Sequence, residues 1–346
     1  MTASLDGQTA VSGEVRRRRS GVETDSGKRI TTMAIKYGTS GNDWLSGSDD
    51  VDDLFGDDGN DLLVGLGGAD HLHGGAGNDW LLGGAGNDQL FGQDGNDYLE
   101  GGSGADQIWG GSGNQFASYG SDTAGYRTSP EGVFVSLYGL YRGAWGGDAE
   151  GDKLYSIENL WGSKFNDVLW GDDANNALNG FEGNDILRGF FGADSIDGGD
   201  GNDELYGYYG FDTLNGGSGN DRLEGGIDGD TMSGGSGADT FVWMYTAESD
   251  GTSWNTDFIT DFNRAEGDLI DLHGIDADVY AAGDQAFAFI GDASHPFTAP
   301  GQISFAHAAG SPNYTRIFLN TDADAEADGV IHMSGMHAVD ASWFML

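Results

Sequence analysis

The chain has 346 residues, among them 63 glycines, 57 acidic residues and only 15 basic ones, and its formal net charge is −42. A charge of this size opposes compaction unless cations neutralise it, and it repels phosphate backbones, which excludes nucleic acid as a partner. No stretch approaches the roughly 20 apolar residues of a membrane span, and without cysteine the fold has neither disulfides nor thiolate metal sites.

The first 37 residues carry no recognisable element. Arg16 to Arg19 are followed by polar residues where the apolar core of a signal peptide would have to lie, so no N-terminal secretion signal is expected. The mixture of Arg, Ser, Thr and Glu has no apolar period. We therefore predict that residues 1–37 are a disordered or untranslated tail, with Met33 as the candidate start of the natural chain.

A period of nine residues runs through two blocks, 38–118 and 162–242. Every unit begins with glycine, as residues 74–82 do, and each block holds nine units in phase. The sixth position is Asp in 16 of the 18 units, with Gln115 and Asn176 as the exceptions, and the eighth position is apolar in all 18. So regular a pattern is not a flexible linker, and collagen is excluded because glycine is not at every third position.

The position of each residue type in the unit predicts its structure. The first six residues favour a turn built on glycines with positive φ, and the last three favour a short strand whose middle residue, such as Leu81, points inward. Two units would form one coil, so aspartates 18 residues apart, such as Asp61 and Asp79, would lie on one edge in successive coils. Oxygen ligands without Cys or His favour Ca²⁺.

The candidate metal ligands are therefore the sixth-position aspartates. Pairing them 18 apart gives seven pairs in each block, and two of these pairs contain Gln115 or Asn176. The remaining twelve predict about a dozen Ca²⁺ ions, whose charge would offset more than half of the net −42. The candidate ligands are Asp43, Asp52, Asp61, Asp70, Asp79, Asp88, Asp97, Asp106, Asp167, Asp185, Asp194, Asp203, Asp212, Asp221, Asp230 and Asp239.

Two segments lie outside the repeats. In residues 119–161 the run 132–137 alternates like a half-buried strand, which predicts a β spacer that caps one roll and orients the next. In residues 243–346 short runs such as 257–262 and 286–290 predict a packed β-rich cap for the end of a solenoid.

The repeats resemble those of the RTX (haemolysin-type calcium-binding) family. Residues 267–277, 283–291 and 333–335 resemble the C-terminal domain of serralysin-type secreted metalloproteases, although Trp343 stands where that family usually has an acid. The expected fold is all-β, with two parallel β-roll (β-helix) solenoid blocks and a C-terminal β-rich capping and secretion domain. The resemblance implies aspartates that bridge to Ca²⁺ between coils, export by a type I (ABC transporter) secretion system, and an extracellular location.

No catalytic constellation is evident. The His-Glu-x-x-His motif of a serralysin is absent, and so are the Gly-x-Ser-x-Gly elbow and the P-loop. His71 and His73 flank Leu72 on a predicted strand, so we expect them on the solvent face. We expect no enzyme, but a calcium-dependent structural or binding component of the cell exterior. The alternative is the non-catalytic module of an exported metalloprotease, lipase or alginate epimerase.

Two smaller features leave alternatives open. The aromatic residues Trp80, Trp109, Tyr206, Tyr208 and Tyr209 would contact carbohydrate or pack beside the core leucines. Asn320, Asp322, Asp324 and Asp328 follow the spacing of an EF-hand loop without its glycine at position six and glutamate at position twelve. That loop is either a calcium site or a solvated acidic turn.

Overall fold

The structure is a computed structural model, and it describes residues 33–111, 120–139, 143–244, 256–278, 285–293, 297–308, 313–322 and 326–346. Most of the predicted tail lies outside these residues. The chain forms two compact units, Met1–Ser163 and Lys164–Leu346. Regular structure in the described residues is strand apart from two short 3-10 helices, which confirms the all-β class.

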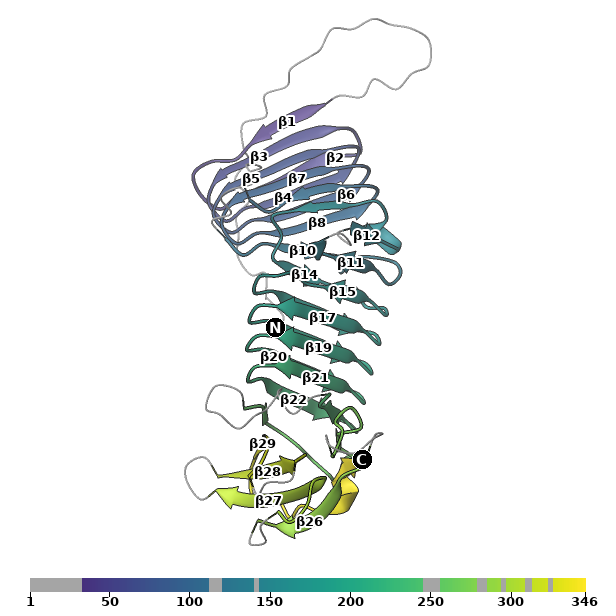
Figure 1. The fold of residues 1–346 in the computed structure, drawn as a ribbon. Coiled ribbons are helices and arrows are strands. Elements are labelled where there is room, and N and C mark those ends of the chain that lie inside the picture. Colours follow the sequence, from purple (N-terminus) through teal and green to yellow (C-terminus); the bar gives the residue numbers. More distant parts are fainter. Residues whose placement is uncertain are drawn as a thin grey trace, which may run out of the picture. The chain divides into compact units, whose positions relative to one another are not determined.

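The first unit is a roll of two parallel sheets (Figure 1). A hairpin of β11 (Phe134–Ser136) and β12 (Gly143–Trp145) and the 3-10 helix η2 (Gly147–Ala149) accompany it. The first sheet contains β1 (Ala34–Tyr37), β3 (Asp52–Asp58), β5 (His71–Ala76), β7 (Gln89–Asp94), β9 (Gln107–Trp109) and β13 (Lys153–Tyr155). The second contains β2 (Trp44–Ser48), β4 (Leu62–Gly67), β6 (Trp80–Ala85), β8 (Tyr98–Ser103), β10 (Thr123–Gly125) and β14 (Asn159–Trp161).

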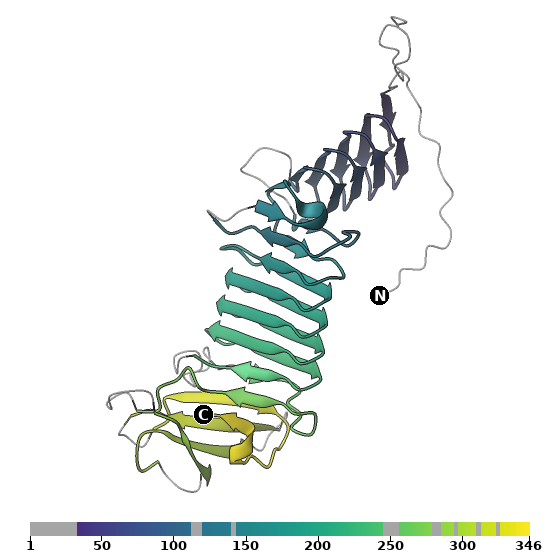
Figure 2. The ribbon, with the colours of Figure 1, turned by 90° about the vertical axis from the view of Figure 1, so that its right-hand side faces the viewer.

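The second unit is again a roll of two sheets, and its strands are seen as stacked rungs in Figure 2. Strands near the C-terminus extend both sheets. One sheet contains β15 (Val168–Trp170), β17 (Ile186–Phe191), β19 (Glu204–Tyr209), β21 (Arg222–Ile227), β23 (Thr240–Val242), β25 (Leu269–Asp271) and β30 (Phe344–Met345). The other contains β16 (Ala177–Glu182), β18 (Ser195–Asp200), β20 (Thr213–Ser218), β22 (Thr231–Ser236), β24 (Phe258–Ile259), β29 (Gly329–Ser334), β28 (Tyr314–Asn320), β27 (Gln302–Ala308) and β26 (Ala288–Asp292). The 3-10 helix η4 (Ala341–Trp343) precedes β30.

The core of both units is the predicted row of eighth-position residues. Leu81 in the first unit and Leu223 in the second are fully buried, and in register each lies beside the eighth-position residue of the next coil. This row confirms the prediction that side chains alternate along each strand and that one apolar residue per unit points inward.

Two predictions about local structure were wrong. The regular strands have six residues, because the backbone pairing between neighbouring strands covers positions seven to nine of one unit and the first three residues of the next, as in β6. The turn is therefore confined to positions four to six. The tail prediction also extended too far, since residues 34–37 form β1 and pair in parallel with β3.

Candidate metal centre

A ladder of carboxylates runs along each edge of the rolls. The backbone N–H of Asp61 donates to Oδ1 of Asp79 at 2.8 Å, and the N–H of Asp79 donates to Oδ1 of Asp97 at 2.8 Å. The same bond recurs at 2.8 Å between Asp203 and Asp185 in the second unit. One carboxylate oxygen of each aspartate therefore satisfies the backbone of the coil before it. All sixteen predicted aspartates are buried.

The other carboxylate oxygen, Oδ2, has no protein partner in most of these aspartates. Fourteen Oδ2 atoms among the described residues are buried without a hydrogen bond. A buried anion that lacks a partner is costly, because it gives up water and gains nothing in return. These atoms belong to Asp61, Asp70, Asp79, Asp88, Asp97, Asp106, Asp122, Asp185, Asp194, Asp203, Asp212, Asp221, Asp230 and Asp239.

The pKa values of the ladder aspartates also indicate that their negative charges are not neutralised within the protein. Burial raises the pKa of Asp61 to about 6, that of Asp185 to about 8 and that of Asp230 to about 9, and neighbouring carboxylates add to the increase. The backbone hydrogen bond to Oδ1 acts in the opposite direction but does not cancel this effect. The ladder therefore lacks positive charge at its centre.

The first-position glycines leave room for these carboxylates. A Cβ on Gly56 would lie 2.3 Å from Oδ2 of Asp61 and 2.4 Å from the carbonyl oxygen of Gly74, distances that no side chain tolerates. A carboxylate oxygen and a backbone oxygen of the next coil therefore face the same small space. Glycine at this position is required by packing.

The terminal rungs of the ladder differ from the interior ones. Oδ2 of Asp43 accepts hydrogen bonds from the N–H of Thr39 at 2.5 Å and from its hydroxyl at 2.8 Å, and Oδ2 of Asp52 accepts the equivalent pair from Ser48. At the far end of the second unit, Oδ2 of Asp257 accepts from Nε1 of Trp243 at 2.6 Å. Protein donors thus satisfy these three terminal carboxylates, whereas the Oδ2 atoms of the interior rungs have no protein donor among the described residues.

Two departures from the repeat have different outcomes. Asn176 lies in the ladder, where its N–H donates to Oδ1 of Asp194 at 2.8 Å and its own Oδ1 accepts from the N–H of Asp172 at 2.7 Å. Gln115 lies outside the described residues. The ladder position expected for Gln115 is taken by Asp122, whose Oδ1 accepts from the N–H of Asp97 at 2.9 Å.

Several ladder residues lie outside the repeat and were not predicted from the sequence. The N–H of Asp106 donates to Oδ1 of Asp152 at 2.7 Å, and those of Asp230 and Asp239 donate to Asp257 and Asp268 at 3.0 and 3.1 Å. The separations of 46, 27 and 29 residues hide these partners from a search for a fixed period. A local signal does exist, since each of them directly precedes a short strand.

His71 and His73 lie on the outer face of β5, as predicted. Nδ1 of His71 lies 2.8 Å from Oδ1 of Asp53. His73 is one member of a stack of six rings along the first sheet, and burial within that stack lowers its pKa. Neighbouring ring centroids lie 4.6 to 5.0 Å apart in the order Tyr37, Phe55, His73, Phe91, Trp109, Tyr155.

The predicted aromatic contacts fall into two groups. Both faces of Trp109 are covered in the ring stack, so it serves packing along the sheet. Trp80, in contrast, is 50% exposed, and Tyr209 is 46% exposed beside Phe191. Tyr206 and Tyr208 contact each other on the outer face of β19.

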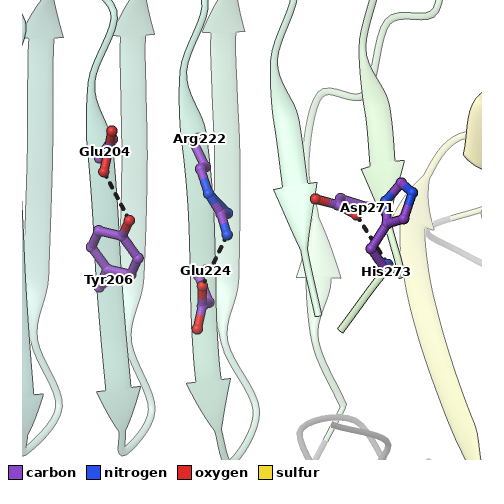
Figure 3. A network of polar contacts seen from close by, with 6 residues as sticks. All are labelled: Glu204, Tyr206, Arg222, Glu224, Asp271 and His273. Carbon is purple, nitrogen blue, oxygen red and sulfur yellow. Dashed lines mark hydrogen bonds and ion pairs between the residues drawn. The ribbon is translucent and has the colours of Figure 1, made fainter. Parts of the chain in front are cut away.

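Polar pairs on the outer face of the second unit are separate from the ladder (Figure 3). Each pair joins residues two apart in the sequence, so that they project from the same side, and none of them occupies a sixth position. The pairs are Tyr206 with Glu204 at 2.8 Å, Arg222 with Glu224 at 3.4 Å, and His273 with Asp271 at 2.8 Å.

The acidic loop near the C-terminus is described only in part, because Asp324 lies outside the described residues. Oδ2 of Asp328 accepts hydrogen bonds from the N–H of Thr321 at 2.6 Å and from its hydroxyl at 2.9 Å. Nδ2 of Asn320 donates to the carbonyl of Glu326 at 2.8 Å. These bonds close the turn, and the question of a calcium site at Asp322 and its neighbours stays a prediction.

The ladder residues fit a hard divalent cation. In the part of the chain that the structure describes, no three His, Cys, Asp or Glu side chains gather into one cluster. A cation between two rungs would have at most two carboxylates, such as those of Asp61 and Asp79, where the charge of Asp79 raises the pKa of Asp61. Backbone oxygens would have to complete the set. Several irregular oxygens of this kind suit Ca²⁺ better than octahedral Mg²⁺.

Comparison with known families agrees with this geometry. The family model "RTX calcium-binding nonapeptide repeat" matches four copies, at residues 37–63, 55–90, 64–99 and 83–114. The model "Peptidase M10 serralysin C terminal" matches residues 155–345, more than half of the chain. The chain belongs to the serralysin C-terminal family. Both resemblances seen in the sequence are thus confirmed, and the serralysin match extends over the second block of repeats as well.

Solved structures similar to this serralysin-type RTX protein include two subunits of the mannuronan C5-epimerase of Azotobacter vinelandii. The AlgE6R3 subunit is 20% identical, with a TM-score of 0.24, over 53% of this chain and 78% of that one. The AlgE6R2 subunit is 24% identical, with a TM-score of 0.27, over 51% and 90%. No curated protein matched this chain. No helix in the described ranges is long and apolar enough to cross a membrane.

Proposed function

We propose that the chain is a secreted calcium-binding RTX protein whose rolls fold when Ca²⁺ enters the interior rungs of the carboxylate ladder. The observation that carries the proposal is the set of buried Oδ2 atoms without a protein partner, which recurs coil after coil. Bound Ca²⁺ would supply the positive charge that the ladder lacks. This chain's own residues would hold it through the Oδ2 atoms of neighbouring rungs and the backbone oxygens of the turns.

The predicted sites are not all alike. The interior aspartates, such as Asp79, have an Oδ2 with no donor, so they fit a calcium ligand best. Asp43 and Asp52 already receive two hydrogen bonds each on that oxygen, so we infer weaker sites at the start of the first unit. About a dozen ions remains our proposal for the whole chain.

Calcium titration of the intact chain tests this proposal. Isothermal titration at pH 7.5 should show several sites per chain, with affinities in the micromolar to millimolar range of sensor and extracellular modules. A chain that binds no Ca²⁺ at millimolar concentration would contradict the proposal.

The role of the protein is inferred from the two families that it matches and from the elements that the described residues form. Both families are those of secreted proteins, so we propose export through a type I (ABC transporter) system and calcium-triggered folding outside the cell. We further propose a non-catalytic, structural or binding role, because regular structure in the described residues consists almost entirely of the strands of the rolls and their C-terminal extension. Hydrolysis of casein, esters or alginate by the calcium-loaded protein at an enzyme-like rate would contradict this role.

A carbohydrate ligand is a second proposal, and one feature favours it. Trp44 and Trp80 are 62% and 50% exposed on the same row of the second sheet, with Leu62 between them in register. Exposed aromatic faces of this kind stack on sugar rings. A glycan array probed with the unmodified chain and with Trp80→Ala, with and without Ca²⁺, would reject the idea if no glycan bound the unmodified chain.

A further inference from the structure

Residues 120–125 restore the repeat after an insertion. A Cβ on Gly120 would lie 1.5 Å from the carbonyl oxygen of Gly95, the contact that fourth-position glycines make with the preceding coil. The N–H of Ser121 donates to Oδ1 of Asn96 at 2.9 Å, as fifth-position residues do. The N–H of Thr123 donates to the carbonyl of Asp97 at 2.8 Å. Asp122 therefore occupies a sixth position, seven residues later than the period predicts.

The carboxylate of Asp122 repeats the geometry of an interior rung. Its side chain is fully buried, and Oδ1 accepts the N–H of Asp97. Its Oδ2 is buried and has no hydrogen-bond partner among the described residues. The corresponding residue on the other edge, Asp152, is different, since its Oδ2 accepts from the hydroxyl of Tyr126 at 3.2 Å. A protein donor thus reaches Asp152 but not Asp122.

A backbone oxygen from outside the repeat faces the same space. A Cβ on Gly110 would lie 2.4 Å from Oδ2 of Asp122 and 2.1 Å from the carbonyl oxygen of Ser156. In the regular coil before it, a Cβ on Gly92 would lie 2.3 Å from Oδ2 of Asp97 and 2.6 Å from the carbonyl oxygen of Gly110. The carbonyl oxygen of Ser156 therefore takes the place of that of a first-position glycine, although the backbone of Ser156 has a left-handed φ of 50° and that of Gly110 does not.

We propose that Asp122 is a calcium ligand, paired with Asp97, in a site that the repeat pattern does not assign. The RTX match ends at residue 114 and the serralysin match begins at 155, so Asp122 lies in neither. The proposal rests on the proposed function, because it extends the same chemistry to a residue outside the period. It makes the row of ions on this edge continuous through the insertion, so the spacer folds together with the first block.

Three substitutions in the full-length chain test the site. Asp122→Asn keeps an oxygen for the N–H of Asp97 and removes the charge, and Asn176 shows that the ladder accommodates this side chain. Asp79→Asn makes the same change at a site within the repeat. Asp197→Asn removes the same charge from the outer face of β18, where Asp197 bonds to Asn179 and Asn215.

Equilibrium dialysis at saturating Ca²⁺ and pH 7.5 counts the bound ions. We expect Asp122→Asn and Asp79→Asn each to lose at least one ion, and Asp197→Asn to lose none. A loss in Asp79→Asn with the full count in Asp122→Asn would overturn this inference and leave the proposed function intact. The full count in both would overturn the two together.

Diffraction from crystals of the unmodified chain grown with Ca²⁺ gives a test that does not depend on how a variant folds. Anomalous density should lie about 2.3–2.6 Å from Oδ2 of Asp122, the usual Ca²⁺ to oxygen distance. Density beside Asp79 and none beside Asp122 would overturn the inference.

Discussion

Removing calcium at pH 7.5 should unfold both rolls. Burial raises the pKa of Asp122 to about 7, as it does for Asp97 and Asp221. A shift from 3.8 to about 7 corresponds to about 4 kcal/mol for each ionised carboxylate, or roughly 2 kcal/mol once solvent screening is allowed for. Eight of the fourteen carboxylates have a pKa raised to about 7 or higher, and their combined cost alone reaches the about 5–15 kcal/mol that stabilises a typical domain.

The assay is far-UV circular dichroism of the intact chain against free Ca²⁺, set with a chelator buffer. We expect a disordered spectrum in excess chelator and a β spectrum that returns cooperatively as Ca²⁺ rises. Mg²⁺ at the same concentration is the control, and it should restore less because it demands octahedral coordination. A β spectrum that persists unchanged in excess chelator at pH 7.5 would refute the reasoning, because the ladder would then be stable with its charges uncompensated.

Three further outcomes follow from the same structure. In excess chelator, the β signal should increase as pH is lowered from about 8 to 5. The pKa values of Asp61, Asp97 and Asp106 in the folded chain are about 6 to 8, above the ordinary aspartate value of 3.8. The folded state is therefore favoured at low pH, and this stability is lost as pH rises through the folded pKa values. A metal-free signal independent of pH would contradict this. Leu81→Ala should lower the free energy of unfolding in Ca²⁺ by about 2–5 kcal/mol, whereas Leu82→Ala, on the outer face, should cost under about 1 kcal/mol in denaturant titrations; equal losses would show that the eighth position is not the core. Gly77→Ala should raise the calcium midpoint far more than Gly41→Ala, because a Cβ at Gly77 would lie 2.0 Å from the carbonyl oxygen of Gly59 at a φ of 130°, while a Cβ at Gly41 would make only an ordinary contact of 3.9 Å with Oγ1 of Thr39. Matching midpoints would refute the packing argument.

The parts of the fold that depend on local periodicity were predictable. Leu81 and its equivalents could be assigned to the core because a residue flanked by outward neighbours on a strand has only one interior to enter. The strand length was underestimated because Gly83 and Gly84 were assigned to a turn on their residue type, although parallel neighbours hold them in the ladder of β6. Tertiary pairing overrides the low strand preference of glycine there.

The missing part of the candidate site has a different cause. A fixed spacing of 18 residues finds Asp79 from Asp61, but Asp122 lies 25 residues after Asp97 and Asp152 lies 46 residues after Asp106. Such insertions change the number of residues between two neighbouring rungs but not the structure of the coil, because only the turn residues next to the aspartate must keep their geometry. The short motif of Gly120, Ser121 and Asp122 would have located this rung, whereas the donor role of Tyr126 toward Asp152 depends on tertiary packing alone.

The terminal carboxylates Asp43, Asp52 and Asp257 have protein donors and the interior ones do not, and this difference limits where coils can be added or lost in evolution. An interior coil, such as residues 61–78, contacts the similar coils on either side of it. One more coil therefore adds about 4.8 Å of roll and leaves the contacts of Thr39, Ser48 and Trp243 unchanged. Tandem duplication in the gene can therefore lengthen the protein in whole coils without a new end having to evolve. Loss of a terminal coil, in contrast, removes donors that no interior coil can replace, so variation in repeat number is confined to the middle of each roll.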